Sequence, residues 1–196
     1  MGKRNTNRHA VRRRPASQSA DDLPLIVIVV SRYNWSITGK LLLGALKAFH
    51  EYLPESNPVI IEASGAFEIP QLCESAACNK DVIGIVALGC IIKGETIHDR
   101  VLADAITPAL LDVAINNGVA VSLGVLTVDT PAQADARCGG ENGTGPGNKG
   151  AEAMHALFQT LFGMSAAVAG EAFSIESAAP DKANPGARKK RGGSGS

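Results

Sequence analysis

The sequence lacks a hydrophobic segment long enough to cross a membrane, because no apolar run reaches the roughly 18 residues that a bilayer requires. Its basic N-terminus is not followed by an uninterrupted apolar core with a small-residue cleavage site, so a secretory signal is not expected. The four cysteines form no C-x-x-C pair, which argues against a metal or disulfide role. We therefore expect a cytoplasmic protein without membrane contact, in which Cys73, Cys78, Cys90 and Cys138 are free thiols.

Charge is balanced overall, with 19 basic and 19 acidic residues, but it is unevenly distributed. Six cations and no acid occupy the first fourteen residues, and residues 188–191 form a second basic cluster. The composition predicts a disordered basic arm over residues 1–22 and a flexible Ala/Pro/Gly-rich tail over residues 166–196. A single folded domain is expected over residues 23–165. The basic arms favour weak, non-specific contact with nucleic acid phosphates.

Between the arms, hydrophobic patterns typical of strands and helices alternate. The β-branched run at residues 25–30 indicates a strand buried on both faces, and Leu42, Leu46 and Phe49 recur at helical spacing. The predicted strands cover residues 25–30, 59–61, 82–88 and 121–126, and the predicted helices cover about 15 residues ending near 53, then 69–79, 101–118, 132–137 and 149–162. Pro108 is expected to kink the third helix. The alternation predicts an α/β domain with one four-stranded parallel sheet and helices on both faces.

In such a sheet, ligands bind beyond the carboxyl ends of the strands. After the first predicted strand, the ring of Tyr33 can stack on a flat heterocycle. The alternative is a simple helix-capping turn with Ser36 or Thr38 as the cap. After the second strand, Gly65 allows close backbone approach, and the Glu68 carboxylate can bind a polar ligand. Alternatively, Glu68 only favours the positive end of the next helix.

The loop after the third strand opens the long helix with a glycine-led turn, whose amides suit a phosphate. It lacks the spacing of a nucleotide-binding loop, so ATP and GTP are disfavoured. His98 lies in the first helical turn, where the dipole favours a neutral ring that can accept a proton. Arg137 and Lys149 offer fixed positive charge for a phosphate. Alternatively, His98 is a simple surface histidine, and Arg137 and Lys149 are solvated surface cations.

Five motifs in one order resemble the lumazine synthase family, across roughly residues 25–163. They are Arg-Tyr-Asn at 32–34, Gly-Ala-Phe-Glu-Ile-Pro at 65–70, Leu-Gly-Cys-Ile-Ile-Lys-Gly-Glu-Thr-Ile-His at 88–98, Gly-Val-Leu-Thr-Val-Asp-Thr-Pro at 124–131 and Asn-Lys-Gly at 148–150. The resemblance implies a flavodoxin-like three-layer sandwich. It also implies a transferase that joins 5-amino-6-(D-ribitylamino)uracil to 3,4-dihydroxy-2-butanone 4-phosphate. The product is 6,7-dimethyl-8-ribityllumazine, the reaction is the penultimate step of riboflavin biosynthesis, and no metal or organic cofactor is needed.

The resemblance also implies roles for individual residues. Ribitylaminouracil would be bound by Tyr33, Asn34, Ala66, Phe67, Glu68, Cys90, Ile91, Ile92 and, from a neighbouring subunit, Leu123. Butanone phosphate would be bound by Glu95, Thr96, Arg137 and Lys149, and His98 would shuttle protons. Several positions depart from the family pattern, which often has Phe or Trp at Tyr33 and Pro at Ser64, and usually has an aromatic residue at Leu123. After the histidine the family commonly has an aromatic, an acidic and an aromatic residue, where this sequence has Asp99-Arg100-Val101.

The family forms homopentamers with sites between subunits, and in some members pentamers assemble into hollow shells. Eleven positions separate Arg137 from Asn148, a longer connection than shell-forming members have. Residues 139–147 include five glycines and a proline, which predict a flexible, protruding loop. We expect a pentamer or decamer rather than a sixty-chain shell. Two other functions stay open, a cage or scaffold protein with nucleic-acid-binding arms and a non-catalytic flavin binder.

Overall fold

A four-stranded parallel sheet forms the middle layer of the structure, a computed structural model that describes residues 24–170. Its strands are β1 (Leu25–Ser31), β2 (Val59–Ala63), β3 (Val82–Ile92) and β4 (Ala120–Val128), in the order β2-β1-β3-β4. The predicted α/β class, with one four-stranded parallel sheet flanked by helices, is confirmed. The arm expected over residues 1–22 lies outside the described residues, as does the tail expected over residues 166–196 from residue 171 onward, whereas residues 166–169 of that tail belong to a helix.

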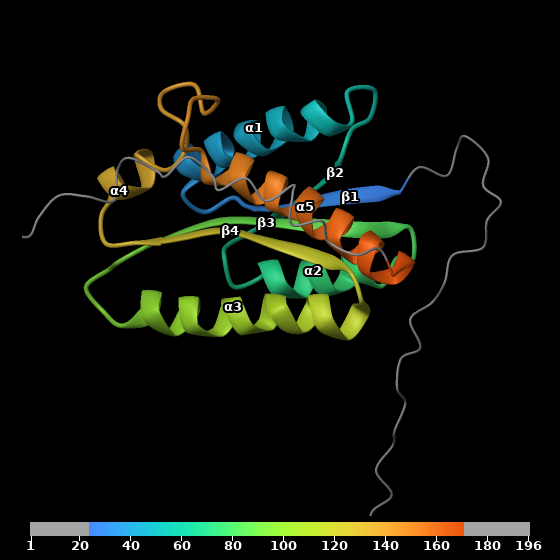
Figure 1. The fold of residues 1–196 in the computed structure, drawn as a ribbon. Helices are drawn as coiled ribbons and strands as arrows, with labels where there is room; N and C mark the ends of the chain where they lie inside the picture. The colour runs from blue at the N-terminus through green and yellow to red at the C-terminus, as the bar shows by residue number, and fades with distance from the viewer. Residues whose placement is uncertain (1–23, 171–196) are drawn as a thin grey trace, which may run out of the picture.

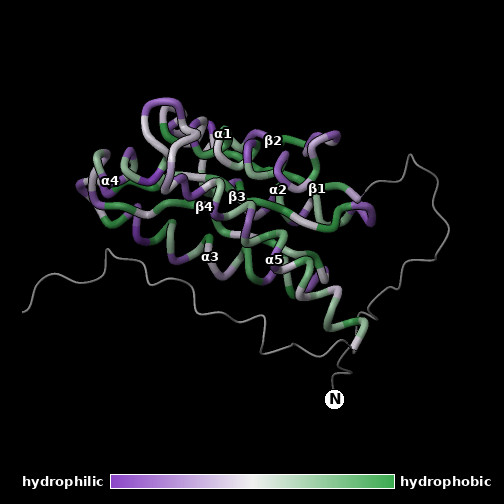
Figure 2. The backbone as a smooth tube through the Cα atoms, turned by 45° about the horizontal axis from the view of Figure 1, so that its top comes forward, coloured by the Kyte–Doolittle hydropathy of each residue, from purple (hydrophilic) through white to green (hydrophobic). Residues whose placement is uncertain are grey.

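Helices cover both faces of the sheet (Figure 1). Helices α1 (Trp35–Tyr52), α4 (Pro131–Asp135) and α5 (Lys149–Ala169) pack on one face, and α2 (Ile69–Ala77) and α3 (His98–Asn117) pack on the other. Ile26 and Ile28 join the core under α1 and α5, whereas Val27 and Val29 join the core under α2 and α3. Burial on both faces explains the continuous hydrophobic run of β1, and Figure 2 shows such strands between helices of mixed hydropathy.

Several elements run further than the sequence predicted. β3 continues to Ile92, so Cys90–Ile92 belong to the strand rather than to the loop after it. α5 continues past Phe162 to Ala169 and ends at Gly170, whose φ of 70° closes the helix. The extra turns are rich in alanine, a strong helix former that outweighs the single Gly163. α3 continues through Pro108 to Asn117. No helix within residues 24–170 has the length and hydrophobicity to span a membrane.

The glycine-rich loop 139–147 projects above the start of α1 in Figure 1, but it is not loose. Gly143 is buried against Lys40, Lys47 Nζ donates to the Thr144 carbonyl at 3.3 Å, and the Gly145 amide donates to Gly139 at 2.9 Å. Four of its glycines have φ between 67° and 80°, which other residues rarely adopt. The expectation of a flexible loop is therefore corrected, because contacts with α1 hold its middle at Gly143 and Thr144.

Close packing of α5 on α1 depends on a glycine at the start of α5. A Cβ at Gly150 would overlap the backbone carbonyl of Leu41, which cannot swing aside as a side chain can. Gly163, further along the same helix, faces open space.

Gly150→Ala should therefore destabilise the protein by about 1–3 kcal/mol, the usual cost of overpacking. Gly163→Ala is the matched control and should leave stability unchanged or raise it by up to about 1 kcal/mol, since alanine favours helix. Denaturant unfolding of both variants measures the difference. Equal stability of the two variants would contradict the close packing of α1 and α5.

Three of the four cysteines are buried, namely Cys73 in α2, Cys90 in β3 and Cys138 after α4, and all four are free thiols in the structure. Burial raises the pKa of Cys73 to about 12. Burial, with smaller contributions from Cys138 and Asp135, raises the pKa of Cys90 to about 11. These thiols therefore stay protonated near neutral pH and are poor nucleophiles.

Iodoacetamide at about pH 8 should accordingly alkylate the exposed Cys78 first, with Cys73, Cys90 and Cys138 at least about tenfold slower. Peptide mapping by mass spectrometry over time measures the four rates. In a Cys78→Ser control the fast phase should disappear. Alkylation of Cys90 as fast as that of Cys78 would show that its thiol is accessible and ionised.

Candidate active site

Three loops meet at the carboxyl edge of the sheet, where β2, β1 and β3 lie side by side. They enclose a pocket of about 460 Å³, which we call the crevice pocket. It is lined by Tyr33, Asn34, Gly65, Ala66, Phe67, Glu68, Cys90, Ile91, Ile92, Gly94, Thr96, His98, Asp99 and Leu102. The helices that follow β1 and β3 lie on opposite faces of the sheet, so the pocket occupies a topological switch point.

Asn34 connects the two central strands across this switch point. It is the one non-glycine residue with positive φ within residues 24–170, at 58°, a conformation that asparagine tolerates better than most. Its Nδ2 donates to the Cys90 carbonyl at 3.0 Å. Ser36 and Thr38 lie inside α1, and the N-cap is Asn34 without a side-chain cap. The capping turn considered for this segment is therefore wrong, and Asn34 instead fixes the β1 loop to β3.

Two aromatic rings stand at the pocket with most of their surface exposed, Tyr33 at 69% and Phe67 at 68%. The loop that carries Tyr33 is anchored by its neighbours, since the Arg32 guanidinium lies 4.1 Å from the Trp35 ring centroid and 3.4 Å from Glu62. Exposed aromatic rings on an anchored loop are typical of surfaces that a ligand or partner covers. Tyr33 is thus placed for stacking on a flat ring.

The Glu68 carboxylate closes the turn after β2. Its Oε2 accepts from the Gly65 amide at 2.9 Å, and a Cβ at Gly65 would lie 3.1 Å from the same oxygen. Glu68 also occupies the N-cap position of α2, where its side chain makes no capping hydrogen bond, and it lines the crevice pocket. The turn gives the pocket a fixed wall of backbone and carboxylate groups.

β3 extends beyond its pairing with β1, which ends at Val30 and Leu88. From Cys90 to Ile92 the strand pairs only with β4, so its other edge faces the crevice pocket with backbone groups. One of these, the Cys90 carbonyl, already accepts from Asn34. This edge can hydrogen-bond a planar ligand as a further strand would.

His98 is the first residue of α3, and its exposed ring lines the crevice pocket. Its backbone amide donates to Thr96 Oγ1 at 3.3 Å, which orders the turn before the helix. The half-buried Asp99 and Leu102 line the pocket as well. The motifs did not single out Leu102, although its position one helical turn after His98 places both on one face.

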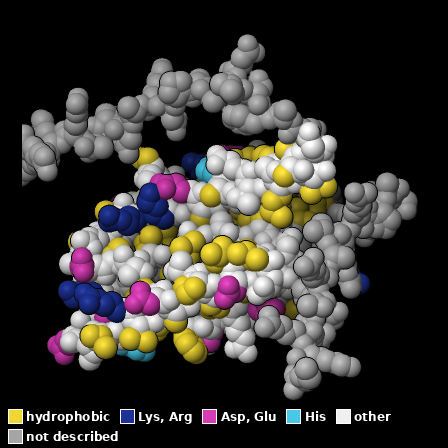
Figure 3. Space-filling view, turned by 60° about the horizontal axis from the view of Figure 1, so that its bottom comes forward, with side chains coloured by type: hydrophobic (Ala, Val, Ile, Leu, Met, Phe, Trp, Pro, Cys, Tyr) yellow, Lys and Arg dark blue, Asp and Glu magenta, His cyan; other side chains and the backbone are white. Residues whose placement is uncertain are grey.

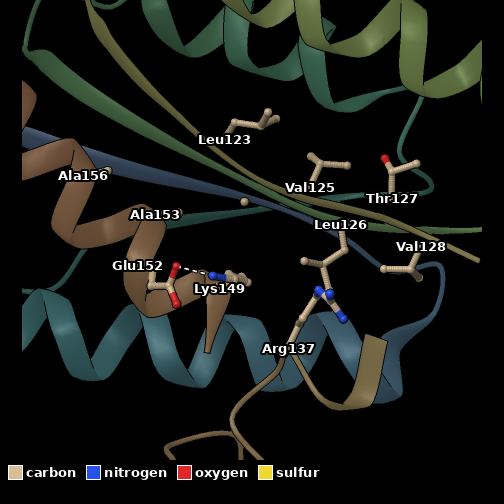
Figure 4. Close-up of a pocket in the computed structure, with 11 residues that line it drawn as sticks. Leu123, Val125, Leu126, Thr127, Val128, Arg137, Lys149, Glu152, Ala153 and Ala156 are labelled. Carbon is tan, nitrogen blue, oxygen red and sulfur yellow. Dashed lines mark hydrogen bonds and ion pairs between the residues drawn. The ribbon is translucent and has the colours of Figure 1, made fainter. Parts of the chain in front are cut away.

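Leu123, Arg137 and Lys149 lie elsewhere, in a second pocket of about 400 Å³ along β4, the edge strand of the sheet (Figure 4). We call it the edge pocket. Arg137 Nη1 donates to the Gln133 carbonyl at 2.8 Å, and Lys149 pairs with Glu152. The spacing of Glu152 three residues after Lys149 in one helix could have predicted this pair.

No lining residue is common to the two pockets, and Glu95 lines neither. One chain therefore does not assemble the predicted cradle of Glu95, Thr96 and Arg137. The part of the chain that the structure describes contains no group of three metal-ligating side chains.

Comparison with known proteins identifies the family. Residues 24–164 match the family described as 6,7-dimethyl-8-ribityllumazine synthase. A relative of that name from Rhodopirellula baltica is 38% identical over 137 residues, which are 69% of this chain and 86% of the relative. Another of that name from Kosmotoga olearia is 40% identical over 129 residues, which are 65% of this chain and 80% of the relative. Because the family match covers well over half of the chain and every loop of the crevice pocket, the chain belongs to the 6,7-dimethyl-8-ribityllumazine synthase family.

Proposed function

We propose that the chain condenses 5-amino-6-(D-ribitylamino)uracil with 3,4-dihydroxy-2-butanone 4-phosphate to 6,7-dimethyl-8-ribityllumazine, releasing phosphate and water. This is the penultimate step of riboflavin biosynthesis, and we place it in the cytoplasm. The observation that carries the proposal is the crevice pocket, where the loops of three family motifs meet at one switch point. Mixing the protein with both substrates and recording lumazine fluorescence tests it. A flavin carrier or a nucleic-acid scaffold would give no product.

Ribitylaminouracil fits the crevice pocket by chemistry and by shape. The exposed ring of Tyr33 stacks on the pyrimidine, and the backbone edge of β3 at Cys90–Ile92 pairs with its amide groups. The turn Ala66–Glu68 holds the hydroxyls of the ribityl chain, with Asn34 beside the ring. The Asn34 amide, the Glu68 carboxylate and the backbone of β3 are held by hydrogen bonds before the ligand arrives, which lowers the entropy cost of binding.

His98 transfers protons in the reaction. The amine of the uracil attacks the ketone of butanone phosphate, and the imine forms only when the carbonyl oxygen leaves as water. This step needs a proton donor, and the later loss of phosphate needs a base that removes a proton from carbon. One histidine at the start of α3 serves both steps, because it donates a proton as the imidazolium and, once deprotonated, accepts one as the imidazole. The protonated Cys90 thiol takes no part as a nucleophile.

We propose further that the complete site lies between two copies of the chain. The edge pocket of one copy would face the crevice pocket of its neighbour, so that Arg137 and Lys149 meet Glu95 and Thr96 around the phosphate. Two features support this arrangement. β4 is an edge strand, which presents unpaired backbone groups and Leu123, half of whose surface is exposed. The planar guanidinium of arginine can donate two parallel hydrogen bonds to a phosphate, and the ammonium group of lysine adds a compact positive charge.

His98→Ala should lower turnover about 10- to 1,000-fold, the effect of one acid–base group, with little change in KM for either substrate.

Arg137→Ala should instead weaken the binding of butanone phosphate by about 2–4 kcal/mol, the loss of a charge-assisted contact, and leave the binding of the uracil substrate nearly unchanged. Steady-state kinetics with each substrate varied measures both effects. Equal losses for the two substrates in Arg137→Ala would make Arg137 a structural residue.

Mixed oligomers provide the control for the shared site. Chains with His98→Ala and chains with Arg137→Ala, coexpressed, should recover part of the wild-type rate, because some interfaces then combine two intact halves. Sites contained in one chain would give no recovery.

Members of this family form homo-oligomers, and exposed hydrophobic side chains on α3 and at its N-cap fit such an assembly. Ile97, Val101, Leu111 and Ile115 are each more than half exposed. Figure 3, which brings the α2 and α3 side forward, shows hydrophobic side chains gathered in the middle of this face. Contiguous apolar surface of this kind marks contacts between proteins. We propose that a second copy of the chain covers it.

A pentamer or a decamer is the assembly we expect. The projecting loop 139–147 adds bulk beside α1, where close approach of pentamers in a shell would meet it. Multi-angle light scattering should give a mass near five or ten chains. A sixty-chain particle would contradict the proposal.

A further inference from the structure

Asn148 has an unusual concentration of hydrogen bonds for one buried side chain, which is only 3% exposed. Its Nδ2 donates to the carbonyls of Lys40 at 2.8 Å, Cys138 at 2.9 Å and Gly143 at 2.6 Å. Its Oδ1 accepts from the amides of Gly150 at 2.7 Å and Ala151 at 3.0 Å. Every polar atom of the amide is therefore used.

These bonds join α1, which is 108 positions away in sequence at Lys40, to the glycine-rich loop and the start of α5. The acceptors lie in α1, directly after Arg137 and in the middle of the glycine-rich loop, while the donors begin α5. The Lys149 amide also donates to the Arg137 carbonyl at 2.9 Å. The loop thus closes on itself at its base, and the two residues on either side of the closure are Arg137 and Lys149. Both line the edge pocket.

The structure reserves space for this amide. A Cβ at Gly44 in α1 would overlap the Asn148 side chain, so α1 has a glycine where the side chain enters. The role also requires asparagine, because the side chain must donate on one side and accept on the other. Aspartate would only accept, and serine would cap α5 but could not reach three carbonyls.

We propose that Asn148 is a positioning residue for the phosphate subsite. It fixes the base of loop 139–147, and thereby the separation of the Arg137 and Lys149 side chains that bind the phosphate. The inference rests on the proposed function, since it assigns butanone phosphate to these two cations. It goes further in assigning the geometry of the pair to a residue that does not touch the substrate.

Asn148→Ser is the primary test, because serine is an equally good helix cap and adds no charge. α5 should still begin at the same residue and the backbone bond from Lys149 to Arg137 can remain, while the side-chain bonds to the Lys40, Cys138 and Gly143 carbonyls are lost. We expect KM for butanone phosphate to rise about 10- to 100-fold, as for a misplaced binding group, and KM for the uracil substrate to change less than about threefold. Inhibition by inorganic phosphate should weaken by the same factor.

Two further variants keep the test decisive. Gly44→Ala displaces Asn148 from the α1 side without changing the loop or the cations, so it should reproduce the selective rise in KM even if Asn148→Ser folds poorly. Lys47→Ala removes the contact with Thr144 at the loop tip but leaves the base closed, and it should behave as wild type. A purely structural role would lower the melting temperature and the active fraction without separating the two substrates.

Equal changes in both KM values, or a fall in kcat alone, in the folded variants would overturn the proposal. Failure of the proposed function is separate, because the wild-type chain would then make no lumazine. In that case calorimetry with inorganic phosphate still tests the positioning role. Binding to wild type that weakens in Asn148→Ser supports the role, and equal binding to both proteins overturns it.

Discussion

The parallel hydrogen bonding of β1 with β3 is the constraint on which the site depends. These strands are adjacent although β2 lies between them in sequence, and their following helices cover opposite faces. The chain must therefore diverge at their carboxyl ends, which leaves a crevice that helices do not fill. The register from Ile26↔Gly84 to Val30↔Leu88 then sets how far β3 continues past β1, and so which backbone groups face the crevice. Asn34 binds the Cys90 carbonyl at the point where this pairing has ended.

The fold could be predicted from local patterns because the two central strands, β1 and β3, are buried along most of their length. β1 is a continuous apolar run, and the spacing of Leu42, Leu46 and Phe49 indicates a helix that packs on it. The ends of the elements were less predictable. Cys90–Ile92 were assigned to a loop, but pairing with Leu126–Val128 of β4 keeps them in the strand. That partner is more than thirty positions away in sequence, so no local signal reveals it.

The candidate site was predictable as a set of residues but not as an arrangement. The order of motifs along the chain says which loops carry chemistry, and ten of the residues named from sequence meet in one pocket. The order of motifs does not say that Leu123, Arg137 and Lys149 line a different pocket, along the edge strand β4. The glycine-rich loop likewise has a composition typical of flexibility. The contacts of its Gly143 with Lys40 and of its Thr144 with Lys47 are long-range and became visible only in the structure.

The separation of the two pockets also has a consequence for how such an enzyme is controlled in the cell. Under the proposed arrangement an isolated chain holds two half-sites and no whole one, so activity follows the association equilibrium by mass action. Specific activity would then depend on how much protein has accumulated, and newly made chains would stay silent until partners are available. Association of chains along the edge strand β4 would thus set a threshold protein concentration for flavin synthesis. No single residue of either pocket has this property alone.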